Sequence, residues 1–146
     1  MADRLCQRQW KGVLRSIADE FNEHLSAREL ADMFVRIGAR FARSNPLAAG
    51  ETLEDLQAHM NGLWSSMDWG VVNLFTEDDH MVVRHQFSPL MSGFGAESAD
   101  WAGAFLLGIY RQWLEDAGSG DDLVLEAFTS VDEWGSIEFR LEAQAS

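Results

Sequence analysis

The chain has 146 residues, close to the usual size of one domain and long enough to bury a substantial core. Hydrophobic residues make up 47% of it, which excludes disorder as the main state. The single cysteine, Cys6, excludes an internal disulfide framework and a cysteine-ligated zinc site. The net charge of −13 disfavours nucleic acid as a partner, because its phosphates would be repelled. We therefore expect one globular domain over residues 1–146.

Helical periodicity dominates the first half of the sequence. An apolar stripe predicts a first helix over about 6–23, and its members are Trp10, Val13, Leu14, Ile17 and Phe21. Ser26 and Glu29 have the spacing of a capping box, which predicts the start of a second helix. Ser44-Asn45-Pro46 ends that helix, because proline excludes the helical conformation from the residue before it. Thr52, with an acidic residue three positions later, predicts the start of a third helix.

The hydrophobic period then changes from about four to two. Two strands are expected at Trp69–Thr76 and Met81–Ser88, joined by a short hairpin loop. After a loop over Pro89–Gly95, a fourth helix is expected over about 99–116, followed by two strands near the C-terminus, Leu123–Thr129 and Ser136–Ala143. The predicted fold is α+β: three N-terminal helices, a β-hairpin, a long helix and a second β-hairpin (ααα-ββ-α-ββ), with an antiparallel sheet packed on helices.

The sequence contains no recognisable catalytic constellation. Its four histidines lack metal-ligand spacing, and no glycine-rich phosphate loop is present. For His85, a half-buried structural histidine is the favoured interpretation and a catalytic base is the alternative. The carboxylate pairs fall in predicted turns, where turn formation and solvation explain them: Asp78-Asp79, Asp121-Asp122 and Asp132-Glu133. We therefore expect no enzymatic activity, no cofactor and no bound metal.

Charge is distributed unevenly along the chain. Residues 1–43 carry a balance of +2, whereas residues 44–146 carry −15. Within the first helix, four basic residues step by four, three and four positions and so share one face, more than about 120° from the apolar stripe. We call these residues the basic stripe: Arg4, Arg8, Lys11 and Arg15. The second helix repeats the pattern with Arg36, Arg40 and Arg43. The basic stripe is either a surface that meets a partner or an ordinary solvated helix face.

Three segments carry the most distinctive patterns: LQAHMNGLWSSMDWGVVNL (56–74), MVVRHQFSPL (81–90) and WAGAFLLGIYRQWL (101–114). The most specific piece is Met67-Asp68-Trp69-Gly70, followed by His85 with Pro89 four residues later, and then Gly108-Ile109-Tyr110 with Trp113. Together they resemble the D subunit of bacterial cellulose synthase complexes, and the similarity runs nearly end to end. None of these motifs is a catalytic signature.

The resemblance implies a non-catalytic accessory protein that forms a homo-octameric ring. Internal passages of the ring would suit β-1,4-glucan chains, and N-terminal segments would lie near them. Expected partners are further copies of the chain, other cellulose synthase subunits and a β-1,4-glucan chain, and the role is in producing ordered, crystalline cellulose. By this resemblance, the residues of this chain expected to line a glucan passage or to bind a partner are Arg4, Arg8, Lys11, Arg15 and Trp10. The structural motif residues are Trp69, Gly70, His85, Pro89, Tyr110 and Trp113.

Two other functions compete with this interpretation. One is a regulatory module that binds a small molecule in a pocket around Trp69, His85 and Tyr110. The other is a small glucan hydrolase that acts through acidic residues. Four tryptophans are expected in the core or in subunit contacts, namely Trp64, Trp69, Trp101 and Trp113. For Trp10 and Trp134, contact with glucan is a second alternative, because an exposed indole face suits the axial C–H face of a glucose ring.

The first 16 residues indicate in which cellular compartment the protein is expected. Residues 1–16 carry charges throughout and contain no apolar core of a secretory signal. The sequence also has no run of 18 apolar residues, so no membrane-spanning helix is expected. We expect a cytoplasmic protein, with the periplasm as the second choice.

Overall fold

A computed structural model describes residues 2–95, 98–118, 123–132 and 134–143. Side chains in the first helix are described from Trp10 onward. The elements follow in the order α1 (Ala2–His24), α2 (Ala27–Ser44), α3 (Leu53–Met67), β1 (Val71–Glu77), β2 (His80–Gln86), α4 (Leu90–Phe94), α5 (Ala99–Asp116), β3 (Leu123–Ala127) and β4 (Ile137–Ala143). The α+β architecture predicted from the sequence is confirmed.

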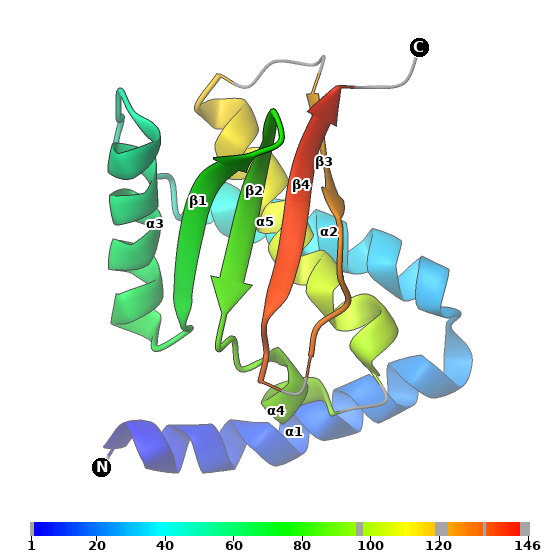
Figure 1. Ribbon diagram of the computed structural model, residues 1–146. Coiled ribbons are helices and arrows are strands. Elements are labelled where there is room, and N and C mark those ends of the chain that lie inside the picture. Colours follow the sequence, from blue (N-terminus) through cyan, green and yellow to red (C-terminus); the bar gives the residue numbers. More distant parts are fainter. Residues whose placement is uncertain (1, 96–97, 119–122, 133, 144–146) are drawn as a thin grey trace.

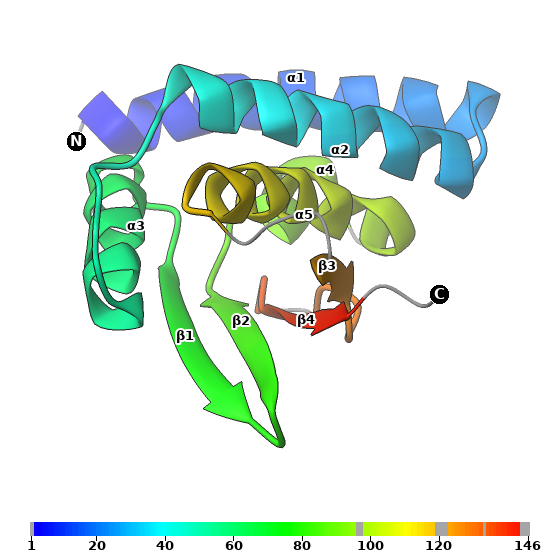
Figure 2. The same cartoon turned by 90° about the horizontal axis from the view of Figure 1, so that it is seen from above.

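The four strands form one antiparallel sheet in the order β1-β2-β4-β3. Both predicted hairpins are present, and they join where β2 pairs with β4, for example at Val83 opposite Phe139. Figures 1 and 2 show the arrangement in layers, with α5 between the sheet and α2. Among the described elements, the opposite face of the sheet has no helix over it. The core therefore lies between α5 and one face of the sheet.

Helix α3 covers the β1 edge of the sheet. The Asn61 side chain accepts a hydrogen bond from the Val72 amide (2.8 Å) and donates one to the Val72 carbonyl (2.9 Å). The Gln57 side chain accepts a bond from the Leu74 amide at 2.8 Å. These side chains satisfy edge groups that would otherwise be free to pair with another strand.

The helix ends follow the predicted local signals. Ser26 and Glu29 form both hydrogen bonds of the capping box at the start of α2. Thr52 caps α3 by accepting a hydrogen bond from the Asp55 amide. Helix α2 ends just before Asn45 and Pro46, as expected. The bounds of α5 match the predicted helix over 99–116.

Several predicted elements need correction, and strand β3, for example, ends at Ala127 rather than at Thr129. The segment Pro89–Gly95, expected to be a loop, contains the short helix α4, because Pro89 is well suited to the first turn of a helix. The first helix begins at Ala2 rather than near residue 6. The first hairpin is shifted by one or two residues, because Asp78 and Asp79 both adopt left-handed conformations and so make a tight two-residue turn.

Helices α2 and α5 cross in very close contact. A Cβ added to Gly38 would overlap the backbone oxygen of Phe105, and a Cβ added to Gly108 would overlap the backbone oxygen of Val35. The two glycines therefore let the helix backbones approach each other more closely than any other residue would allow. This contact joins the outer helix layer to the core.

The long helix α1 is held mainly through its C-terminal half. Ala18 is fully buried in a small cluster with Leu30, Phe34 and Trp101. The Asn22 side chain accepts a hydrogen bond from the Trp101 indole N–H at 2.7 Å. Figure 1 shows α1 running along the lower end of the molecule, next to α4. This attachment leaves much of the predicted apolar stripe outside the core.

Candidate functional site

Three side chains and one backbone carbonyl meet in a hydrogen-bonded network at the centre of the core. The indole N–H of Trp64 donates to the Tyr110 hydroxyl at 2.9 Å, and that hydroxyl lies 2.5 Å from Nδ1 of His85. The other ring nitrogen of His85, Nε2, lies 2.7 Å from the backbone oxygen of Trp69. With a neutral imidazole, which the low pKa of about 4 favours, all the bonds form at once when Tyr110 donates to Nδ1 and Nε2–H donates to Trp69. His85 is then neutral, and the central network has no unpaired polar atom.

Burial controls the protonation of this network. Removal from water lowers the pKa of His85 to about 4, although its bond to the Trp69 carbonyl acts in the opposite direction. Burial also raises the pKa of Tyr110 well above 10, outweighing the effect of the Trp64 hydrogen bond. At neutral pH both groups are uncharged and engaged with protein atoms. His85 is therefore a buried structural histidine, and it is more deeply buried than the sequence predicts.

The pocket required by a small-molecule module is not formed around these residues. His85 and Tyr110 are fully buried, and Trp64 packs against both rings. Neither residue has a polar atom left to receive a ligand. A groove of about 440 Å³ lies elsewhere, between the α2–α3 connection and the C-terminal end of α5. The prediction of a pocket around Trp69, His85 and Tyr110 is wrong, because aromatic side chains fill that space.

The other motif residues shape the surroundings of the network. Gly70 has a φ of +89°, and a Cβ there would overlap the Gln86 carbonyl oxygen, so this turn requires glycine. Pro89 accepts a hydrogen bond from the Gly93 amide in α4 at 2.8 Å. Trp113 packs edge-to-face on Tyr110 with ring centroids 5.9 Å apart, and its indole N–H donates to the Asn45 carbonyl. Trp64, Trp101 and Trp113 are buried, and Trp69 is partly buried against the core.

The carboxylate pairs do not form an acid–base site where the structure describes them. Asp78 and Asp79 make the tight turn between β1 and β2. The Asp132 side chain accepts hydrogen bonds from two backbone amides of its own turn. Asp121, Asp122 and Glu133 lie outside the described residues. Each described carboxylate is thus explained by local turn structure.

One acidic group was not found by the sequence analysis. Glu20, Glu23 and His24 have potential ligand atoms within 4.8 Å of one another on the exposed surface of α1. Glu20 and His24 form an i,i+4 pair at 3.0 Å, which is a common contact on a helix surface. That spacing was visible in the sequence, and it indicates a helix-surface pair rather than a metal site.

The basic stripe is exposed where its side chains are described. Lys11 and Arg15 lie on the surface of α1, and the Arg15 side chain runs over Gly95 at the end of α4. The side chains of Arg4 and Arg8 lie outside the described part of the chain. The structure thus describes the side chains of two of the four residues in the basic stripe.

The apolar stripe of α1 is the feature that sequence reasoning misjudged. Trp10 is 60% exposed, Val13 46% and Ile17 42%, whereas helix periodicity alone favours their burial. Where side chains of α1 are described, from Trp10 onward, the helix meets the core through Ala18 and the partly buried Phe21. The three exposed residues recur at positions i, i+3 and i+7, so they lie along one side of α1. We call Trp10, Val13 and Ile17 the exposed apolar stripe.

In the described residues, every helix is too short or too polar to cross a membrane. Fold and site together define an α+β domain with a closed polar network in its core and a long helix on which Trp10, Val13 and Ile17 are exposed.

The family model for the D subunit of cellulose synthase matches residues 1–140, and the chain belongs to this family. Relatives named cellulose synthase operon protein D include one from Komagataeibacter xylinus, 23% identical over 127 residues, covering 85% of this chain and 81% of the relative. Another from the same organism is 27% identical over 90 residues, covering 60% of this chain and 58% of the relative. One from Komagataeibacter sucrofermentans is 22% identical over 127 residues, with coverage of 85% and 81%.

Proposed function

We propose that this protein is a non-catalytic accessory subunit of a bacterial cellulose synthase complex. It would form a homo-oligomer, an octamer by resemblance, and act as a scaffold that organises synthases or guides nascent β-1,4-glucan chains for ordered export and crystallisation. Membership of the family supports the accessory role in cellulose synthesis. The closed His85–Tyr110 network supports a structural rather than catalytic centre. We further propose that residues 1–146 act as one domain and work in the cytoplasm.

The observation that carries the scaffold proposal is the exposed apolar stripe. Complete burial of a large apolar side chain contributes about 1.5–3 kcal/mol, so three such residues along one helix give a strong reason to associate. Their i, i+3, i+7 spacing is the pattern by which a helix docks on an apolar surface of another protein. A second copy of this chain is the partner that an obligate homo-oligomer provides. We therefore place a subunit contact at Trp10, Val13 and Ile17.

A triple variant tests this contact. Trp10→Gln, Val13→Gln and Ile17→Gln remove the apolar stripe while keeping good helix formers in α1. We expect sedimentation velocity to show a fall in particle mass toward 16.4 kDa, with helix content by circular dichroism nearly unchanged. Leu53→Gln is the matched control, because it removes an exposed apolar residue from another helix. Full-size particles of the triple variant would contradict the contact.

The basic stripe is proposed to meet a glucan chain or a partner in the synthase complex. Changing Arg4, Arg8, Lys11 and Arg15 to Ser should alter stability by no more than about 0.5 kcal/mol at each surface position away from packed features. We expect the native oligomer to persist, because the stripe lies on a different side of α1 from the exposed apolar stripe. Cells that carry only this variant should make less cellulose, or less ordered cellulose.

Two measurements decide the outcome for the basic stripe. Light scattering gives the particle mass, and X-ray diffraction of the purified cellulose gives its crystallinity. Dissociated particles would instead assign the stripe to a subunit contact, since its guanidinium groups would lose partners across the interface. Unchanged assembly with unchanged cellulose would identify the basic stripe as an ordinary solvated helix face.

A further inference from the structure

Strand β3 forms the edge of the sheet that lies opposite the edge covered by α3. The strand order β1-β2-β4-β3 places β3 at the end of the sheet, whereas Asn61 and Gln57 of α3 bond to the other end, β1. In Figures 1 and 2, no described helix or strand continues the sheet beyond β3. An edge of this kind offers its amides and carbonyls to any strand that approaches it.

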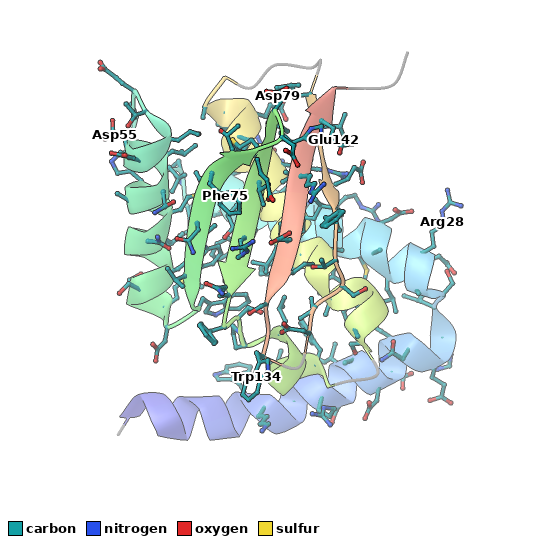
Figure 3. The ribbon with its side chains drawn as sticks, in the orientation of Figure 1. Arg28, Asp55, Phe75, Asp79, Trp134 and Glu142 are labelled. Atoms are coloured by element: carbon teal, nitrogen blue, oxygen red, sulfur yellow. The ribbon has the colours of Figure 1, made fainter. Side chains whose placement is uncertain are left out.

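The pairing of β3 with β4 shows which backbone groups point away from the sheet. The Phe128 amide donates to the Glu138 carbonyl at 2.8 Å, so the backbone of Phe128 faces β4. Inward and outward positions alternate in an antiparallel ladder, so Glu126 and Val124, which lies opposite Glu142 (Figure 3), also face β4. The backbone groups that point outward therefore belong to Leu123, Leu125 and Ala127.

Arg111 of α5 occupies the middle of this edge. Its Nε–H donates to the outward carbonyl of Leu125 at 2.8 Å. Its Nη2 lies 3.1 Å from a carboxylate oxygen of Glu126, with which it forms an ion pair. The Arg111 and Glu126 side chains are 34% and 64% exposed, so the ion pair itself contributes little to stability. We call Arg111 and Glu126 the edge pair.

Without the edge pair, the outer side of β3 would suit the same strand of a second copy. Two β3 strands that run antiparallel about Leu125 place the amide of each Leu125 opposite the carbonyl of the other, and such a contact is symmetric. Apolar side chains are exposed near both ends of the strand, since Leu123 is 39% and Phe128 55% exposed. Exposed apolar residues on an edge strand favour pairing with other chains.

We propose that the edge pair keeps β3 closed against strand pairing with β3 of a second copy. The Arg111 guanidinium occupies the central carbonyl that a second strand would need. Both charged groups of the edge pair would also lose contact with water under such a strand, which opposes its approach. The edge pair thus restricts association between copies to other surfaces of the molecule. This role holds whether or not the copies also assemble through α1.

Light scattering coupled to size-exclusion chromatography tests the proposal on a double variant. Arg111→Leu with Glu126→Thr removes both charges, and threonine favours strands. We expect the particle mass at micromolar concentration to rise about twofold or more over that of the unaltered protein, because each pairing of two β3 edges joins two particles. Addition of Leu123→Lys should return the mass to that of the unaltered protein, because a lysine on an edge strand opposes pairing.

Arg84→Leu with Glu138→Thr is the matched control. Arg84 and Glu138 also form an ion pair on the sheet, but their strands, β2 and β4, already have a neighbour on each side. This variant should keep the particle mass of the unaltered protein.

An unchanged mass of the Arg111→Leu/Glu126→Thr variant would overturn the proposal. An increase that the control variant shares, or that Leu123→Lys does not reverse, would also overturn it, because the association would then come from partial unfolding. Each comparison is made with the mass of the unaltered protein. A monomeric unaltered protein would therefore contradict the scaffold function without deciding the role of the edge pair.

Discussion

Gly108→Ala is expected to destabilise the protein by about 3 kcal/mol or more. The new methyl group would overlap the backbone oxygen of Val35, and a backbone cannot move aside as a flexible side chain does. Helices α2 and α5 would have to separate, which would loosen the contact between the outer layer and the core. A loss of this size is a large part of the roughly 5–15 kcal/mol that stabilises a typical domain.

Gly62→Ala is the matched control for this prediction. Gly62 also lies within a helix, but a Cβ there would meet nothing within 4 Å. Alanine has the higher helix propensity, so this variant should gain up to about 1 kcal/mol. Urea unfolding measures the change in the free energy of unfolding for both variants. Gly38→Ala should destabilise the protein in the same way as Gly108→Ala. Equal stability of Gly108→Ala and Gly62→Ala would show that the close crossing of α2 and α5 is not present in solution.

Acid is expected to destabilise the fold through His85. At pH 7 His85 is neutral in both the folded and the unfolded chain. As the pH falls below 6.5, the unfolded chain takes up a proton, whereas the folded chain resists it until the pH approaches about 4. Stability contributed by this residue is thus complete above pH 6.5 and is lost as the pH falls toward 4. The gap between the two pKa values corresponds to about 3 kcal/mol.

His85→Gln separates this effect from the titration of the many carboxylates. Glutamine offers a donor and an acceptor but does not titrate, so the variant should be less stable at pH 7 and lose less stability than the unaltered protein between pH 6.5 and 4. Titration of Tyr110 does not change the stability between pH 6.5 and 4, because its pKa lies well above 10. Urea unfolding at several pH values gives both curves. Parallel curves for the two proteins would mean that His85 is protonated equally in the folded and unfolded states.

Local signals in the sequence predicted much of the fold. The capping box at Ser26 and Glu29, the stop at Asn45-Pro46 and the bounds of α5 depend on contacts within a few residues. The alternation of apolar residues in β4 likewise predicted its buried face, which contains Ile137 and Phe139. The pairing of β2 with β4 depends on contacts across more than 50 residues, so only the two hairpins could be predicted.

The sites were harder to predict because they depend on long-range contacts. The bond between His85 and Tyr110 forms when α5 packs on the sheet, and no spacing in the sequence indicates it. Periodicity identified the apolar side of α1, but it could not show that Ala18 reaches the core while Trp10, Val13 and Ile17 stay exposed. The left-handed Phe87 was also not predicted, because backbone strain of this kind is imposed by tertiary structure.

The mass of the native particle tests the scaffold account most directly. Light scattering coupled to size-exclusion chromatography, with the unaltered protein at micromolar concentration, requires no partner and no substrate. The account predicts a homo-oligomer with a mass several times 16.4 kDa, in which the exposed apolar stripes are covered by other copies. A stable particle of 16.4 kDa under these conditions would contradict it.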